Sequence, residues 1–297
     1  MADKEIITTV ETSTISNEPT KPVSIVKKPE ISISGFFSGF QISYPEYEVI
    51  TPQTLQSFTV RSMTVSEEET LKGSALTPKK IAEHLSSSLW KCIVKKPDTI
   101  KSYDDFISRV TLKDRDAILY GMYHATYKDT QAYDLRCEKC GASYAVSCKL
   151  NEIFSMTAYT GNKDDILSMK IPVALDVASN ITAIIKQPVL KDEHSIMSDM
   201  LFQTEKALET AIETLVIDRF IVSNSDGSKT EIITRDNIMS GYNSLPAADR
   251  KQIQKKYFDS FGQYSLKLEI KSNCSKCAEL NTTQLDLVNQ FFRVIMQ

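Results

Sequence analysis

Four of the six cysteines form two Cys-x-x-Cys pairs, Cys137/Cys140 and Cys274/Cys277. Four thiolates are a common ligand set for a structural zinc ion, which they surround as a tetrahedron. A Cys-x-x-Cys at a tight turn brings two sulfurs within reach of one ion. Gly141, which follows the first pair, permits the positive φ that folds backbone amides toward the sulfurs. The sequence therefore predicts that these four cysteines bind one structural Zn²⁺ ion.

The two pairs are separated by about 130 residues of chain. Closing a random-coil loop of that length costs on the order of 4 kcal/mol beyond a constant. Structural zinc binding contributes roughly 10–16 kcal/mol, so one shared ion is favoured. Two alternatives stay open: a redox Cys-x-x-Cys, which requires a thioredoxin-like strand-to-helix setting, and cysteines that bind no metal.

Other groups capable of chemistry are scattered along the chain. His84, His124 and His194 lie in separate predicted helical segments, and no nucleophile or zinc-protease motif accompanies them. His124 precedes the first pair and is considered as an accessory ligand, although packing is favoured. Asp104-Asp105 and Asp164-Asp165 lie near predicted helix starts, where the helix dipole stabilises negative charge. We therefore expect no enzyme, no catalytic residues and no organic cofactor.

Strand-like sequence leads into both cysteine pairs. Around the first pair, apolar residues alternate as in a β-hairpin: Tyr133, Leu135 and Cys137 before the turn, and Tyr144, Val146 and Cys148 after it. Residues 264–270 alternate in the same way and run directly into Cys274. Two strand-borne turns of this kind are how a zinc ribbon presents its ligands. Cys92 and Cys148, outside the pairs, are expected to pack in the core.

Helix signals occur on both sides of the first pair. Thr77-Pro78 is typical of a helix start, and an apolar stripe that includes Cys92 follows it before Pro97. Ser102 and Thr111 are predicted N-caps. Between the two pairs, residues 150–270 are expected to be mostly helical, with the longest helix over residues 195–222.

These elements predict an α+β fold, in which a discontinuous zinc-ribbon-like β module carries a mainly α-helical insertion. Residues 1–42 are expected to form a flexible N-terminal tail or arm, because they show no apolar period. Residues 43–150 would hold the N-terminal helices and the first zinc-knuckle hairpin. Residues 151–262 would form the helical insertion. Residues 263–297 would supply the second zinc knuckle and a hydrophobic C-terminus.

Composition narrows the classes of protein further. The chain has 297 residues, 41% hydrophobic and 25% charged, which are ordinary values for a folded globular protein. A net charge of −3 offers no broad basic surface for nucleic acid. The N-terminus lacks a secretion signal, and no stretch approaches the roughly 20 apolar residues that cross a bilayer. Paired, sparse cysteines indicate a reducing compartment, so we expect a cytoplasmic protein that binds no membrane.

The order of several short phrases resembles a known family. These phrases are Ser43-Tyr-Pro-Glu-Tyr-Glu-Val-Ile50, Phe58-Thr-Val-Arg-Ser-Met-Thr-Val-Ser-Glu-Glu-Glu69, Cys137-Glu-Lys-Cys-Gly141, Leu245-Pro246, Phe261-Gly262, Cys274-Ser-Lys-Cys277 and Phe291-Phe292-Arg293. Over residues 43–297 the chain is similar to the baseplate hub family of contractile-tailed bacteriophages related to the T-even type. The four cysteines carry over as metal ligands.

The resemblance implies a non-catalytic role in assembling the central hub beneath the tail tube. The protein would act as a structural subunit or an assembly chaperone that binds other hub or tail proteins. It would work in the host cytoplasm during assembly, and retention in the virion tail baseplate stays open, as does a homo-oligomer. Apolar residues at 36–40 and 291–296 are the predicted contact surfaces.

Two other classes of function are weighed against this one. The first is a nucleic-acid-binding zinc ribbon, such as a phage transcription accessory, against which the acidic balance argues. The second is an enzyme whose site has no recognisable motif.

Overall fold

The computed structural model describes residues 43–74, 78–127, 130–162, 165–198 and 205–296. The predicted N-terminal tail or arm (1–42), with its aromatic segment, lies outside the described residues. Within the described ranges, no helix combines the length and the apolar character needed to cross a membrane.

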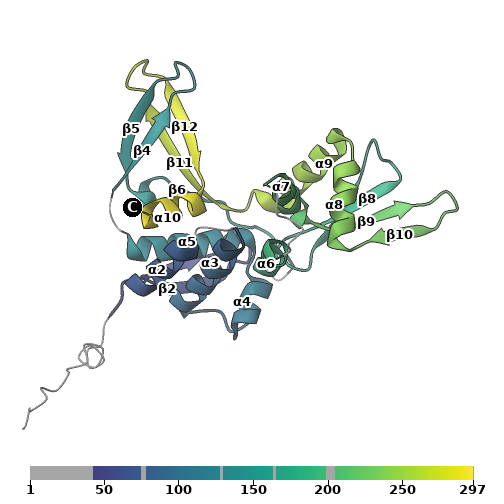
Figure 1. Ribbon diagram of the computed structural model, residues 1–297, viewed down its shortest axis with the longest axis horizontal. Coiled ribbons are helices and arrows are strands. Elements are labelled where there is room, and N and C mark those ends of the chain that lie inside the picture. Colours follow the sequence, from purple (N-terminus) through teal and green to yellow (C-terminus); the bar gives the residue numbers. More distant parts are fainter. Residues whose placement is uncertain (1–42, 75–77, 128–129, 163–164, 199–204, 297) are drawn as a thin grey trace, which may run out of the picture. The chain divides into compact units, whose positions relative to one another are not determined.

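The described chain is mixed α/β, with several small antiparallel sheets (Figure 1). The strands are β1 (Glu46–Ile50), β2 (Ser57–Arg61), β3 (Ile93–Lys95), β4 (Gln131–Arg136), β5 (Ser143–Cys148), β6 (Phe154–Met156), β7 (Lys170–Ala174), β8 (Ile181–Lys186), β9 (Ile217–Ser223), β10 (Lys229–Ile232), β11 (Leu266–Asn273) and β12 (Leu280–Leu285). The helices are α2 (Val65–Ser74), α3 (Pro78–Cys92), α4 (Tyr103–Arg109), α5 (Leu112–Thr126), α6 (Leu190–Ser198), α7 (Glu205–Glu213), α8 (Arg235–Ser244), α9 (Ala247–Tyr257) and α10 (Leu287–Ile295). The sheet orders are β1-β2-β3, β10-β9-β8-β7, β12-β11-β6 and β4-β5.

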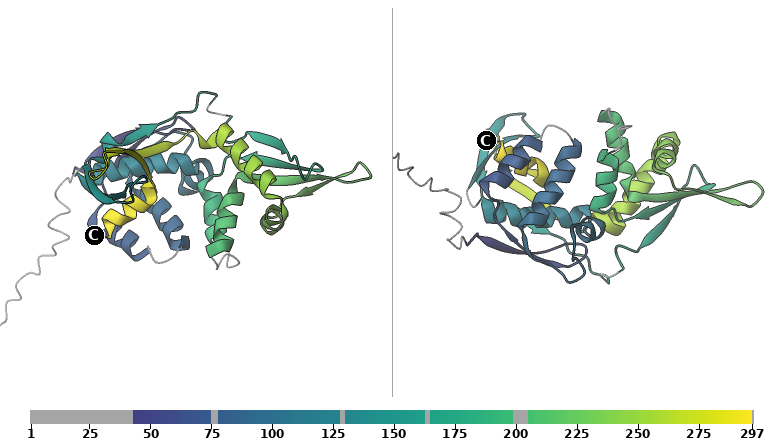
Figure 2. Two further views of the ribbon diagram at one scale, coloured as in Figure 1. Left: turned by 90° about the horizontal axis from the view of Figure 1, so that it is seen from above. Right: turned by 60° about the horizontal axis from the view of Figure 1, so that its bottom comes forward.

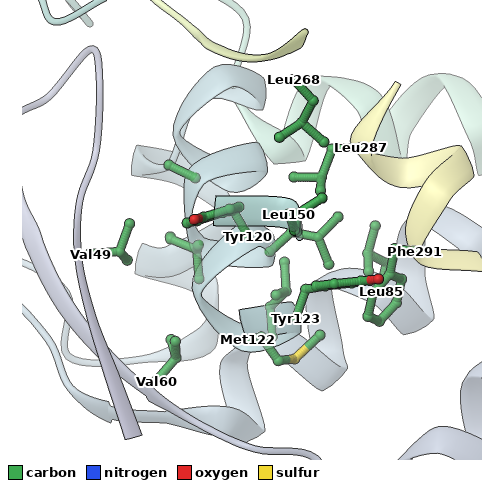
Figure 3. Packing of buried hydrophobic residues seen from close by; sticks show 14 of the residues in the cluster. Val49, Val60, Leu85, Tyr120, Met122, Tyr123, Leu150, Leu268, Leu287 and Phe291 are labelled. Carbon is green, nitrogen blue, oxygen red and sulfur yellow. The ribbon is translucent and has the colours of Figure 1, made fainter. Parts of the chain in front are cut away.

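Helix α5 lies at the centre of the larger hydrophobic core. All its residues from Ala117 to Tyr123 are buried, as expected for a helix that is covered on every side. Strands β1 and β2 approach it at Gly121, where an added Cβ would lie 2.9 Å from a Val60 methyl. On another side Tyr123 faces Phe291 of α10 (Figure 3). The beginning and the end of the described chain therefore share one core.

The hydrophobic C-terminus packs against this same core. Leu287, Phe291 and Ile295 recur at four-residue steps along α10 and are all buried. The helix lies against α2 and α5 (Figures 1 and 2). Of the predicted contact surface 291–296, only Met296 is largely exposed, so this surface is mostly occupied by the protein's own core.

Residues 151–262, predicted as a mainly helical insertion, hold helices α6 to α9 and also a sheet that the sequence analysis did not predict. They contain the four-stranded sheet β10-β9-β8-β7, on which α8 and α9 pack to form a second core. The strands are short and rich in β-branched residues, and Ala183, Ile185 and Phe220 from β8 and β9 are buried. Apolar runs this short are compatible with a helix as well as with a strand. Pairing between the runs, which a single run does not show, determines that they form a sheet.

The predicted long helix over residues 195–222 is wrong in its second half. Helix α6 ends at Ser198 and α7 ends at Glu213, while residues 199–204 lie outside the described ranges. From Ile217 the chain is strand β9, which pairs with β8. The β-branched residues of β9 favour this extended pairing.

Several local predictions around α3, α4 and α5 are confirmed. Ser102 and Thr111 cap α4 and α5, accepting backbone N–H bonds from Asp105 and Asp114. Cys92 is fully buried at the end of α3. The predicted Thr77 cap lies outside the described residues, and α2 was missed although Thr64 and Glu67 form a capping box at its start.

Gln53, in the turn between β1 and β2, joins the two cores. Its backbone N–H donates to the Asp114 carboxylate at 2.8 Å. Its side-chain amide donates to the Phe261 carbonyl at 3.0 Å and to Gln187 Oε1 at 3.2 Å. Burial raises the pKa of Asp114 to about 6, although hydrogen bonds from Thr54 and Gln53 oppose this. Buried polar groups thus fasten the insertion to the larger core.

Candidate metal centre

The first knuckle, residues 137–142, is the turn of the β4–β5 hairpin. The strands pair in register from Gln131 opposite Cys148 to Arg136 opposite Ser143, as the alternation predicts. The Cys137 N–H donates to the Ala142 carbonyl, and the Gly141 N–H donates to the Cys137 carbonyl, each at 2.9 Å. Gly141 has a φ of +69°, the left-handed conformation expected for this glycine.

The second knuckle, residues 274–279, is the turn between β11 and β12. The Cys274 N–H donates to the Glu279 carbonyl at 2.8 Å, and the Ala278 N–H donates to the Cys274 carbonyl at 2.9 Å. Ala278 has a φ of +56°. The hydrogen bonds and the positive φ occupy the same positions as in the first knuckle, so the two turns have the same fold.

The structure brings the four predicted ligand atoms together. Sγ of Cys137 lies 3.6 Å from Sγ of Cys277, and Sγ of Cys140 lies 3.7 Å from Sγ of Cys274. All four sulfurs lie within 4.8 Å of one another. A tetrahedron with metal–sulfur bonds of about 2.3 Å has edges of about 3.8 Å, whereas a disulfide is about 2.05 Å long. The four cysteines are therefore free thiols spaced to bind one metal ion.

Backbone amides prepare two of these sulfurs to be thiolates. N–H groups, that of Cys140 foremost, lower the pKa of Cys137 to about 6. The pKa of Cys274 is lowered in the same way, first by the N–H of Cys277. For Cys277 the N–H of Glu279 acts to lower the pKa, but partial desolvation and hydrogen bonds with the neighbouring sulfurs outweigh it and raise the pKa to about 12. Four adjacent sulfurs carry full thiolate charge only with a cation among them.

Side chains outside the knuckles hold the two hairpins next to each other (Figure 1). Asn281 Oδ1 accepts the backbone N–H of Glu138 at 3.1 Å, and Asn281 Nδ2 donates to the Glu279 carbonyl at 2.9 Å. The Tyr144 hydroxyl and the Ser272 hydroxyl are 3.1 Å apart. Sequence patterns gave no sign of these roles, because a single asparagine on a strand is compatible with plain solvent exposure.

One cysteine of each pair is buried in the larger core, and the other is exposed to solvent. Cys137 and Cys274 are buried in the larger core, at 1% and 2% exposure, while Cys140 and Cys277 are exposed. Four protein ligands leave no coordination position for a substrate, which is the arrangement of a structural site.

The remaining cysteines and histidines lie elsewhere. Within the described ranges, the only group of Cys, His, Asp and Glu side chains close enough to hold a metal ion consists of the four paired cysteines. The ring of His124 lies 4.5 Å from the ring of Tyr47, which supports packing over an accessory-ligand role. His194 Nε2 is 3.0 Å from Ser86 Oγ. Cys148 is half-buried in β5, and burial raises the pKa of its thiol.

The chain was compared with known proteins and protein families. No curated protein and no solved structure matches it. The family described as T4 bacteriophage base plate protein matches residues 44–293, which include both knuckles and the insertion. This match indicates a structural, non-enzymatic role in the virion tail, in contact with other tail or base plate proteins, and it does not favour a nucleic-acid-binding function. The chain belongs to the T4 bacteriophage base plate protein family.

Proposed function

We propose that Cys137, Cys140, Cys274 and Cys277 bind one structural Zn²⁺ ion within a non-catalytic protein that acts in assembly of the base plate central hub. The observation that carries the zinc proposal is the spacing of the sulfurs, 3.6 and 3.7 Å across the two knuckles. These distances fit the edge of a tetrahedral four-thiolate site. A tetrahedral set of four sulfurs selects zinc or iron–sulfur chemistry, and so tight a cluster suits a single ion.

In this proposal the ion joins segments that are remote in sequence but adjacent in the fold. It would hold β4–β5 against β11–β12 as a discontinuous zinc-ribbon-like module. The two ends of the insertion would then be held at fixed positions, where they join the linked hairpins. Structural zinc binding contributes roughly 10–16 kcal/mol, so its loss would affect the hairpins and the C-terminal segment of the larger core.

The hub assignment is supported by the resemblance of the short sequence phrases and by membership of the base plate family. The protein would bind other hub or tail proteins in the host cytoplasm during assembly. It would serve either as a subunit that stays in the base plate or as a chaperone that leaves.

Metal analysis of the purified full chain tests the zinc proposal. We expect one zinc per chain, and a loss of that zinc in Cys274→Ser. Cys148→Ser is the matched control, since this cysteine lies outside the cluster, and it should retain the metal. A wild-type chain that binds no zinc under reducing conditions, or a Cys274→Ser variant that keeps it, would reject the proposal.

The assembly role is tested by affinity capture of the tagged protein during particle assembly, followed by a search for it in purified particles. Co-purification with hub or tail proteins is expected. Presence in finished particles identifies a subunit, and absence from them identifies a chaperone. Capture of no base plate or tail protein contradicts the hub role.

A further inference from the structure

A pocket of about 530 Å³ lies away from the knuckles, where the insertion meets the larger core. Its walls come from α5, from the end of α9 with the π-helical turn Phe258–Gly262, and from β11 and β12. Its volume is in the range of sites that bind small molecules or side chains, and such sites are frequent between packed units.

The charged residues of this pocket are all of one sign. Lys113 from α5 and Lys267 from β11 line it, and no Asp or Glu does. In the part of the chain that the structure describes, no carboxylate oxygen lies within 4.0 Å of either ammonium group. The acidic neighbours are engaged elsewhere: Asp116 pairs with Arg115 at 3.0 Å, and Glu269 pairs with Lys271 at 2.9 Å. Two half-buried lysines therefore line the pocket, and the carboxylate that attracts Lys113, that of Asp116, is already hydrogen-bonded to Arg115.

The rest of the lining combines uncharged polar residues, Gln254, Ser265 and Gln284, with apolar and aromatic ones. Leu266 and Leu285 form one side, and Tyr257 and Phe258 form the other. Phe258 is 54% exposed at the rim, although a phenyl ring of this size is normally covered. An exposed aromatic side chain beside a pocket is a common anchor point for a partner.

The π-helical turn fixes the aromatic wall. Such turns occur frequently at functional sites. Here Phe261 points into the core at 0% exposure, while Phe258 lies at the surface. Gly262 permits the close packing, since a Cβ there would lie 3.2 Å from the Phe258 ring. The Tyr257 hydroxyl donates to Gln187 at 3.5 Å, which restrains its ring.

We infer that this pocket binds an acidic peptide segment of a partner protein. Carboxylates of the segment pair with Lys113 and Lys267, and an aromatic or aliphatic side chain packs against Phe258 and Leu285. A nucleic acid fits less well, because the lining holds only two cations beside apolar and uncharged polar side chains, and the chain's net charge is −3. The inference rests on the proposed function only in taking the partner to be a protein of the same assembly.

The test uses a fluorescein-labelled peptide of aspartate residues flanking one phenylalanine, titrated with the full, zinc-loaded chain and followed by fluorescence polarisation. We expect saturable binding that weakens by about tenfold or more in the double variant Lys113→Gln/Lys267→Gln. Phe258→Ala should weaken binding several-fold, which a purely electrostatic attraction would not show. The matched control Lys251→Gln/Lys256→Gln removes two exposed lysines of α9 that lie outside the pocket, and it should bind like the wild type.

Several outcomes would overturn the inference. These are no binding by the wild type, equal binding of a peptide with asparagine in place of aspartate, and equal weakening in the control variant. Tripolyphosphate and a single-stranded oligonucleotide are tested as competitors of the labelled peptide. Tighter binding of either one than of the peptide would also reject the inference, since the pocket would then serve another class of ligand. Zinc content is measured on the same samples. The lysine variants should keep their zinc, so failure here is distinguishable from failure of the zinc proposal.

Discussion

In the first knuckle the residue after the second cysteine is Gly141, with a φ of +69°, and in the second knuckle the equivalent residue is Ala278, with a φ of +56°. A left-handed conformation suits glycine, whereas it costs an alanine roughly 1–2 kcal/mol. The same turn forms in both places, so the fold of the second knuckle keeps Ala278 left-handed in spite of this local cost.

The two knuckles also differ in their support. Both hairpins bury side chains in the larger core, such as Leu135 on β4 and Leu268 on β11, but β11 also pairs with β6 on one side and β12 on the other. The β4–β5 hairpin forms a two-stranded sheet of its own among the described residues. Isolated two-stranded hairpins are marginally stable in water. We therefore expect the first knuckle to depend on the shared ion more than the second does.

The largest expected effect comes from Cys274→Ser. Loss of a shared ion should lower amide protection in residues 131–148, although the substitution is more than 120 residues away in the sequence. Hydrogen exchange followed by mass spectrometry measures this, with the sheet of β7–β10 as an internal reference that should stay protected. Should the first hairpin keep its protection while residues 266–285 lose theirs, each knuckle would be independent and the shared site would be wrong.

A smaller effect is expected from Asn281→Ala. Asn281 is 5% exposed and bonds the backbone of both knuckles, so its loss leaves polar groups unpaired and should lower the free energy of unfolding by about 1–3 kcal/mol. Thr282→Ala on the same strand is the control, because its side chain is exposed. Urea unfolding distinguishes them, and equal effects would show that Asn281 does not join the hairpins.

Exchanging the two left-handed residues tests the comparison directly. Gly141→Ala should cost about 1 kcal/mol, all of it from backbone conformation, since an added Cβ meets nothing closer than 3.7 Å. Ala278→Gly should stabilise by about 0.5 kcal/mol, because relief of strain exceeds the added freedom of the unfolded chain. Thermal unfolding of zinc-loaded protein gives both values, and a destabilised Ala278→Gly would mean that the alanine is not strained.

The smallest effect is expected from Lys139→Ala. The Lys139 ammonium and the Glu279 carboxylate are 2.6 Å apart across the knuckles, but both side chains are largely exposed, at 64% and 45%. Exposed pairs of this kind contribute little to stability and are screened by salt. The difference from wild type should therefore shrink further in high salt, and a salt-independent loss would argue for a packing role instead.

The metal cluster was within reach of sequence reasoning because its signals are local. Each Cys-x-x-Cys lies within a single hairpin, and so does the alternation around Tyr133 and Tyr144. The caps Ser102 and Thr111 likewise depend only on residues at the start of their own helices. The sheet in the insertion was missed because β8 is a strand through its pairing with β7 and β9, and the periodicity of its own sequence does not reveal that pairing. The role of Asn281 was missed for the same reason, since its side chain accepts a hydrogen bond from Glu138 of the opposite knuckle. The positive φ of Ala278 was missed because alanine, unlike Gly141, does not signal a left-handed conformation.

Zinc K-edge X-ray absorption of the purified, reduced chain tests the shared site most directly. One zinc surrounded by four sulfurs at about 2.3 Å is the predicted result, because both knuckles then supply ligands to the same ion. A shell of two sulfurs completed by nitrogen or oxygen would show that a single pair holds the metal, and the account of two joined knuckles would be contradicted.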